Sequence, residues 1–241
     1  MILWGGSFLV ILAVALIGIR VYRMLSDLKQ MAAIDSGEII PGIYAIRDSY
    51  VNLYVVKGGE GHVAIDSGID AQVVRDELKK LNIDPASVAA VFLTHSDTDH
   101  TGGLCVFPHA QIYLSGEEEP MVDGRKARFI LYRNKAIPKH ESLMDDQVVD
   151  VGGLTVKTIL TPGHTPGSAS FLVNGQSLFT GDSMRLQNGK AEIFSRSINM
   201  DNDAQYQSLK KLAKLRGVQH VFTGHFRYTD AFDRAFEGFR E

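Results

Sequence analysis

The sequence predicts an α+β fold in which two β-sheets pack together with helices on the outside, preceded by one apolar N-terminal helix. Three observations support this prediction. Both halves of the chain are rich in short β-branched and aromatic runs, and helical segments punctuate them. No repeat or low-complexity segment interrupts this pattern. The 241 residues, 45% hydrophobic and 22% charged, are sufficient for one large core.

The N-terminal segment is predicted to be a membrane anchor. Residues 2–19 contain no charged side chain. The length of this run is at the lower limit of what a membrane-spanning helix needs. A secretory signal peptide would carry basic residues before this run, whereas Arg20 and Arg23 follow it. A buried core helix would need protein on all sides. We therefore expect a single-pass anchor over residues 1–23, in contact with membrane lipid, and by the positive-inside tendency a cytoplasmic main domain.

A juxtamembrane stem is expected over residues 24–41, and one globular domain over residues 42–241. Pro41 and Gly42 mark the boundary. Apolar and alternating patterns then predict helices over 72–81, 203–215 and 230–239, and strands over 43–46, 49–56, 62–66, 89–94, 111–115, 148–152, 154–160, 168–173, 176–180 and 219–223. Helices packed on the outer faces of two sheets bury the apolar side chains of both sheets.

Composition excludes several kinds of site. The single cysteine, Cys105, allows no internal disulfide and no thiolate zinc cluster, so any metal must be held by imidazole and carboxylate. The net charge of -3 creates no field that would attract DNA or RNA, so we expect no nucleic-acid partner.

Residues of the types that bind metals follow five predicted strands, at the point where each strand ends. Loops at strand ends can aim several side chains at one point. The side chains concerned are Asp66, His95, Asp97, Asp99, His100, His164, Asp182 and His225.

Spacing within the segment THSDTDH adds a physical reason for metal. His95 and Asp97 lie two apart in an extended segment and share a face, whereas Asp99 and His100 are better placed for a neighbouring ion. Without a cation, the two carboxylates would repel each other. The segment therefore indicates a bound metal rather than a set of satisfied core residues.

The motifs THSDTDHTGG, TPGHTPGS, TGD and TGH, in that order, resemble the metallo-β-lactamase superfamily over residues 42–241. The resemblance implies a four-layer αββα sandwich with two divalent metal ions, usually zinc, at the edge of the sheets. It implies that Asp182 bridges both ions, that the first is held by His95, Asp97 and His164, and that the second is held by Asp99, His100 and His225.

The resemblance also implies a metal-dependent hydrolase. A water between the two ions loses its proton and attacks the substrate, with Asp99 orienting that hydroxide and Asp66 orienting the loop and its ligands; these two are the predicted catalytic residues. Relatives with the same ligands cleave small esters, thioesters and lactones, and a phosphodiesterase on the same fold is an alternative. Substrate identity does not follow from the ligands.

Asp97 departs from the family pattern. The common motif is H-x-H-x-D-H, and this chain has H-x-D-x-D-H. A carboxylate adds negative charge and a hard donor, which favours iron or manganese relative to zinc. A diiron branch with glutamate at this position reduces oxygen or nitric oxide beside a flavin domain, for which these 241 residues leave no room. We therefore expect a hydrolase first and a diiron redox protein as the alternative.

The segment over residues 117–141 is the least similar to the family. Six basic residues lie there, Arg125, Lys126, Arg128, Arg133, Lys135 and Lys139. It is interpreted either as a solvated surface hairpin or as a lid that attracts an anionic or amphiphilic substrate, and a third alternative is contact with anionic lipid.

Overall fold

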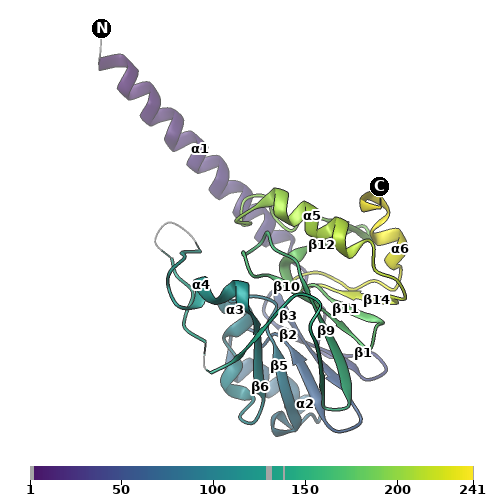
Figure 1. Cartoon of the computed structure of the whole chain (residues 1–241). Coiled ribbons are helices and arrows are strands. Elements are labelled where there is room, and N and C mark those ends of the chain that lie inside the picture. Colours follow the sequence, from purple (N-terminus) through teal and green to yellow (C-terminus); the bar gives the residue numbers. More distant parts are fainter. Residues whose placement is uncertain (1–2, 129–131, 138, 241) are drawn as a thin grey trace.

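The computed structural model describes residues 3–128, 132–137 and 139–240. Two sheets pack face to face, with helix α2 (Ala71–Lys80) over one and helices α5 (Asn202–Leu212) and α6 (Phe232–Ala235) over the other (Figure 1). This arrangement fits the αββα sandwich that the sequence predicts. Two helices of a single turn, α3 (Thr98–Thr101) and α4 (Glu119–Val122), lie in the loops at one edge.

The first sheet has seven strands in chain order. Its first four strands are antiparallel and the following pairs are parallel. The strands are β1 (Gly37–Ile40), β2 (Ile43–Asp48), β3 (Val51–Lys57), β4 (His62–Ile65), β5 (Val88–Phe92), β6 (Gln111–Ser115) and β7 (Glu141–Leu143).

The second sheet has five strands in the order β14-β11-β10-β9-β8. β14 runs parallel to β11, and the other pairs are antiparallel. The strands are β8 (Val148–Val151), β9 (Leu154–Leu160), β10 (Ala169–Val173), β11 (Ser177–Phe179) and β14 (His220–Phe222); a separate hairpin joins β12 (Arg185–Gln187) and β13 (Lys190–Glu192).

Three apolar layers hold these elements together. Between the sheets, Phe92 packs edge-on against Phe171 within one large cluster. Outside the first sheet, Val74 and Leu78 of α2 are fully buried at the i, i+4 spacing of one helix face. A third cluster lies between the second sheet and the helices α5 and α6. Burial on both sides explains why β3 and β10 are mainly apolar and show no alternation of apolar and polar residues.

The predicted transmembrane anchor is wrong. Among the described residues, no helix combines the length and apolar character needed to cross a bilayer. Helix α1 spans Leu3–Gln30 and continues past the uncharged run into a stretch that carries Arg23, Asp27 and Lys29. This finding also overturns the predicted single-pass membrane location with a cytoplasmic catalytic domain, and leaves membrane lipid unsupported as a partner. Residues 1–2 of the predicted 1–23 anchor lie outside the described residues.

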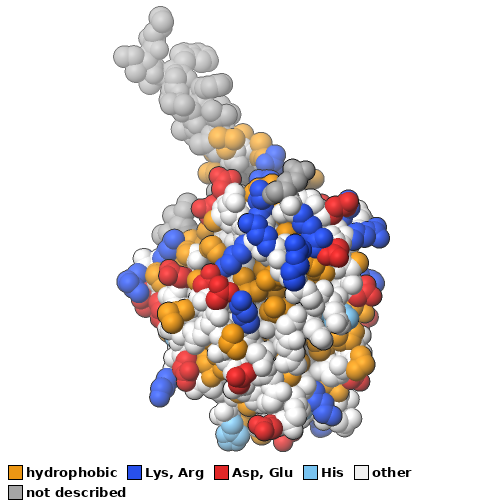
Figure 2. All heavy atoms as spheres, turned by 45° about the vertical axis from the view of Figure 1, so that its right-hand side comes forward, with side chains coloured by type: hydrophobic (Ala, Val, Ile, Leu, Met, Phe, Trp, Pro, Cys, Tyr) orange, Lys and Arg blue, Asp and Glu red, His pale blue; other side chains and the backbone are white. Residues whose placement is uncertain are grey.

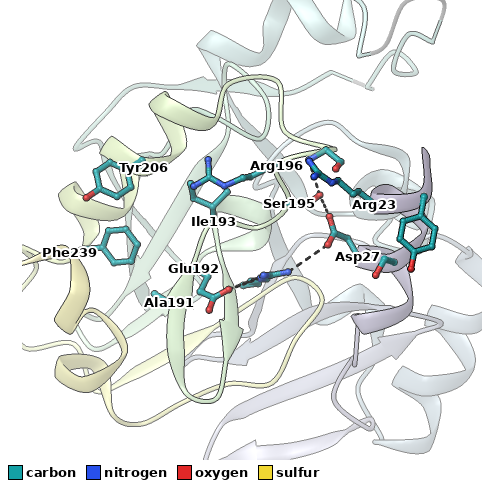
Figure 3. Close-up of a pocket in the computed structure, with 13 residues that line it drawn as sticks. Arg23, Asp27, Ala191, Glu192, Ile193, Ser195, Arg196, Tyr206 and Phe239 are labelled. Carbon is teal, nitrogen blue, oxygen red and sulfur yellow. Dashed lines mark hydrogen bonds and ion pairs between the residues drawn. The ribbon is translucent and has the colours of Figure 1, made fainter. Parts of the chain in front are cut away.

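The C-terminal end of α1 attaches to the domain. Asp27 accepts a hydrogen bond from Ser195 and lies 3.8 Å from Arg185, beside a cavity of about 510 Å³ (Figure 3). Figure 2 shows lysine and arginine side chains gathered on the body near the base of α1. After α1 the chain passes beside His225, one of the predicted metal ligands. The Ala32 amide donates a hydrogen bond to the His225 carbonyl at 2.9 Å.

Four short strands are absent from the sequence-based prediction. β1 lies within the segment predicted as a stem, and β7, β12 and β13 contain three residues each. Each is too short to show an alternating pattern. The C-terminal helix is also shorter than predicted, since α6 covers Phe232–Ala235 within the expected 230–239.

A glycine after the THSDTDH segment allows two loops to meet closely. A Cβ at Gly103 would lie 2.0 Å from the Ser67 carbonyl oxygen. We expect Gly103→Ala to lower the free energy of unfolding by about 2 kcal/mol or more, because backbone must shift to remove this overlap. Chemical denaturation measures the change. The control is Gly59→Ala, since that Cβ would meet nothing within 4 Å; equal effects of the two substitutions would contradict the steric argument.

Candidate metal centre

The predicted metal-ligating residues lie at the same edge of the two sheets. Each follows the end of a strand: Asp66 follows β4, the segment from His95 to His100 follows β5, His164 follows β9, Asp182 follows β11, and His225 follows β14. The sheets are therefore the rigid frame that brings residues from both halves of the chain together.

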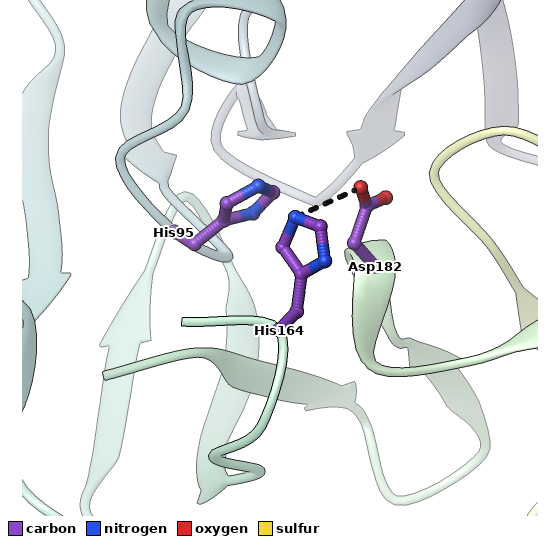
Figure 4. A group of neighbouring side chains, drawn as sticks. All are labelled: His95, His164 and Asp182. Atoms are coloured by element: carbon purple, nitrogen blue, oxygen red, sulfur yellow. Dashed lines mark ion pairs between the residues drawn. The ribbon is translucent and has the colours of Figure 1, made fainter. Parts of the chain in front are cut away.

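Two groups of side chains could each hold a metal ion. In the first, ligand atoms of His95, His164 and Asp182 lie within 4.8 Å of one another, and Figure 4 shows these side chains converging. In the second, Asp99, His100 and His225 meet the same limit. We call these the first cluster and the second cluster; they divide the predicted ligands as the resemblance implies, except for Asp97.

Asp182 lies between the two clusters. Its Oδ2 is 3.4 Å from His164 Nε2, in the first cluster. Its Oδ1 is 3.2 Å from His225 Nε2 and 3.5 Å from His100 Nε2, in the second cluster. One oxygen thus faces each cluster, which is the placement that a bridging carboxylate requires.

All four histidines turn Nε2 toward the clusters and use Nδ1 to contact the scaffold. His100 Nδ1 lies 2.8 Å from Asp66 Oδ2, and His225 Nδ1 lies 2.9 Å from the Tyr50 carbonyl. Because both partners are acceptors, each Nδ1 carries a proton, and in the neutral ring the lone pair is on Nε2.

The other two rings follow the same arrangement. His164 Nδ1 lies 3.2 Å from Asn199 Oδ1, and the amide group of Asn199 donates elsewhere, so this oxygen is the acceptor. His95 Nδ1 contacts Thr94 Oγ1 at 3.1 Å. Outer contacts of this kind are what fix metal-ligating histidines.

The donor set fits a divalent cation. His95 Nε2 and Asp182 Oδ1 are buried and have no hydrogen-bond partner among the described residues. His100 Nε2 and His225 Nε2 lie 3.3 Å apart, so two lone pairs face each other beside Asp182. Buried acceptors arranged in this way need a cation or protons between them.

The electrostatics of the second cluster agree with this reading. Burial alone would lower the pKa of His100, but Asp66, Asp182 and Asp99 outweigh it and raise that pKa to about 10. Burial likewise opposes the shift at His225, whose pKa is raised by Asp182 and Asp99. The surroundings therefore favour positive charge at this place, which a metal ion would supply.

Asp97, the third predicted ligand of the first metal ion, lies beside the first cluster. It belongs to neither group, although its Oδ2 is 3.2 Å from His164 Nε2 and 3.5 Å from His95 Nε2. Its carboxylate accepts from Arg128 Nε at 2.8 and 3.0 Å and from Asn134 Nδ2 at 3.0 Å. Burial would raise the pKa of Asp97, but His164, His95 and Arg128 hold it well below its usual range.

The two predicted catalytic aspartates differ in exposure. Asp99 lines a cleft of about 190 Å³ together with His164, Asp182 and His225. Asp66 is buried, adopts a left-handed φ of 63°, and accepts hydrogen bonds from the backbone and hydroxyl of Thr94 as well as from His100. Asp66 therefore contacts the site behind His100, whereas Asp99 is reached from the cleft.

Part of the segment over 117–141 packs against the site. Five of its six basic residues are exposed, namely Arg125, Lys126, Arg133, Lys135 and Lys139. Arg128 and Asn134 are buried and contact Asp97, and the Tyr132 hydroxyl lies 2.7 Å from Thr98 Oγ1. Residues 129–131 and 138 of this segment lie outside the described residues. In the sequence Arg128 is one of six basic residues in this segment, and no signal distinguishes it from the others.

Glu118 links the two ligand loops and was also missed. It is fully buried and accepts from the Ser96 amide and hydroxyl, the Thr165 hydroxyl and the Gly167 amide, at 2.6 to 3.0 Å. It thus joins the loop that carries His95 to the loop that carries His164.

We expect Glu118→Gln to lower the free energy of unfolding by about 2 kcal/mol, because an amide nitrogen replaces an acceptor and leaves donors unpaired. The denaturant midpoint measures this. Glu117→Gln is the matched control, since Glu117 is exposed one position away. If the two variants unfold alike, Glu118 does not hold the loops together.

Two relatives of this chain are named as a hydrolase and a thioesterase. A hydroxyacylglutathione hydrolase from Shewanella halifaxensis is 30% identical over 186 residues, which are 75% of this chain and 63% of the relative. An atrochrysone carboxyl ACP thioesterase from Aspergillus fumigatus is 30% identical over 177 residues, 72% of this chain and 50% of the relative. The chain thus spans between half and two thirds of the length of these relatives.

A solved structure shares the fold. A metallo-beta-lactamase family protein from Thermus thermophilus superposes with a TM-score of 0.63 at 23% identity, over 83% of this chain and 78% of that one. Residues 46–225 match the family model of the metallo-beta-lactamase superfamily. This range includes every residue of the first and second clusters. The chain belongs to the metallo-beta-lactamase superfamily.

Proposed function

We propose that this protein is a metal-dependent hydrolase that cleaves small esters or thioesters with an apolar acyl part. The observation that carries the proposal is the common orientation of four histidines, whose Nε2 atoms face the two clusters beside the two oxygens of Asp182. Imidazole and carboxylate in this arrangement suit a hydrolytic metal site.

The relatives support the same class of reaction. The matched proteins are a hydroxyacylglutathione hydrolase and an acyl-carrier-protein thioesterase by name. Because the chain spans only part of their length, their substrates inform the class of bond rather than the substrate of this chain. Fold alone does not fix activity.

Side chains of this chain supply the positioning. A divalent cation held there would activate water as the nucleophile and polarise the substrate carbonyl. Asp99 lies at the cleft, so its carboxylate can accept a hydrogen bond from the attacking water. Tyr50 also lines the cleft; burial and then Asp99 raise the pKa of Tyr50 to about 12, so its hydroxyl keeps its proton at neutral pH.

For the metal, we propose two divalent ions and zinc as their identity. Four imidazoles favour zinc among the metals considered. The argument for iron or manganese rested on the extra negative charge of Asp97, and Arg128 neutralises that charge at 2.8 Å. A diiron redox protein therefore has less support than a hydrolase.

The cleft has an apolar wall that bears on the substrate. Part of this wall comes from the end of α1, so the N-terminal helix reaches the site. The apolar lining residues are Met24, Leu28, Met31, Tyr50, Phe194 and Ile198. Such a wall binds hydrocarbon rather than a phosphate, which favours an acyl substrate over a phosphodiester.

The first test measures hydrolysis of a panel of acyl thioesters, acyl esters and a phosphodiester. We expect a chelator to abolish thioester or ester cleavage and zinc to restore it. His225→Ala should lower kcat/KM by more than about a hundredfold, since loss of even an outer partner of a metal ligand costs about 10–100-fold. His109→Ala is the control, because His109 is exposed outside both clusters.

Two results would contradict the proposal. One is no cleavage of any panel member by zinc-loaded protein. The other is iron in the purified protein, with a visible absorption spectrum and consumption of oxygen or nitric oxide, which would favour the redox alternative instead.

The second test concerns the acyl part. Leu28→Ala removes apolar surface from the cleft wall, so we expect kcat/KM to fall about fivefold for a long acyl chain and to change little for acetyl. Leu25→Ala is the matched control, because Leu25 is exposed on the same helix outside the cleft lining. Equal effects on long and short acyl chains would show that α1 does not contact the substrate.

A further inference from the structure

The first cluster already contains a cation supplied by the protein. The guanidinium of Arg128 is buried, with 3% of the residue exposed. Its Nε donates to Asp97, and its Nη2 lies 3.0 Å from His164 Nε2. Arg128 thus contacts His164 of the first cluster and Asp97 beside it.

These contacts use the atoms that a metal ion would need. His164 Nδ1 is held by Asn199, so Nε2 is the nitrogen with the lone pair, and Arg128 donates to it. Asp97 Oδ2 lies 3.2 Å from the same Nε2, and both are acceptors. Because Arg128 donates to both, it relieves the repulsion that a metal ion would otherwise relieve.

The second cluster has no equivalent of Arg128. Its ligands are Asp99, His100 and His225, together with Oδ1 of Asp182. Within the described part of the chain, no lysine or arginine forms an ion pair with Asp99 or Asp182. Among the described residues, the second cluster therefore lacks a basic side chain of the kind that Arg128 supplies to the first cluster.

We propose that Arg128 acts as an internal cation in the first metal site, so that the chain binds one divalent ion tightly in the second cluster and the other only weakly in the first. The inference rests on the proposed function only in that the protein binds metal. It also accounts for the departure from the family motif, because Asp97 and Arg128 form a matched pair of opposite charge.

The surrounding contacts hold Arg128 in this place. Its Nη1 donates to the Ile198 carbonyl at 2.9 Å, and its backbone amide donates to the Tyr132 carbonyl at 2.9 Å. Both ends of the residue are fixed, so a metal ion must displace a held guanidinium from His164 rather than a mobile side chain. Weak binding at the first site follows from this competition.

The experiment is a metal titration of the full chain. Chelator-treated protein is dialysed against graded free zinc, and zinc per chain is measured by plasma mass spectrometry. For the wild type we expect one ion to bind at least about tenfold more tightly than the second. Arg128→Met should reduce this difference in zinc affinity between the two sites, because the variant lacks the guanidinium that competes with the metal ion. Arg128→Gln, which keeps a donor without the charge, should narrow it as well if the methionine variant does not fold.

Arg125→Met is the matched control. Arg125 lies three positions away, pairs with exposed Asp123, and should leave the gap unchanged when replaced. Two wild-type ions of equal affinity would overturn the inference, and so would an unchanged gap in the Arg128 variants. In either case zinc-dependent hydrolysis could still be present, whereas a chain that binds no zinc would overturn both proposals.

Discussion

The site depends on contacts made behind the imidazole rings. Asp66, the Tyr50 carbonyl, Asn199 and Thr94 each hold one Nδ1 atom, and this orients all four Nε2 atoms toward the two clusters around Asp182. Without these contacts each ring could rotate or exchange its proton between nitrogens, and the lone pairs would not converge. Three of the partners lie beside strands of the first sheet, and Asn199 lies in the loop before α5.

A consequence is that the two clusters share ligand types but not electrostatics. Asp182 presents one oxygen to each cluster, yet Arg128 lies beside the first cluster alone. The segment that carries Arg128 packs on the ligand loop, and Glu118 at its start ties that loop to the one carrying His164. The least family-like segment of the chain therefore shapes the metal site directly.

Much of the fold follows from the sequence because burial leaves a pattern. β5 and β10 read as apolar runs, and α2 shows its buried face at i, i+4 spacing. The short strands β12 and β13 leave no such pattern. The apolar N-terminal run predicted a membrane anchor, and that was wrong, since an uncharged stretch in the sequence does not show where the helix ends or what its end contacts.

For the site, short motifs place the histidines and Asp182, because each follows a strand that is easy to recognise. The role of Arg128 depends on a contact between residues 31 and 36 positions apart, and one sequence contains no sign of it. The same is true of Met24 and Leu28, which reach the cleft from α1. Long-range contacts made by common residue types are what sequence patterns omit.

The Nε2 atoms around Asp182 are proposed to hold divalent metal ions. The most direct measurement is an anomalous difference map, collected at the zinc absorption edge, from crystals of the full chain exposed to zinc. The account predicts a strong peak bounded by the Nε2 atoms of His100 and His225 and by Asp182, and a weaker one beside His95. The absence of zinc from both clusters, or zinc bound through Nδ1, would contradict it.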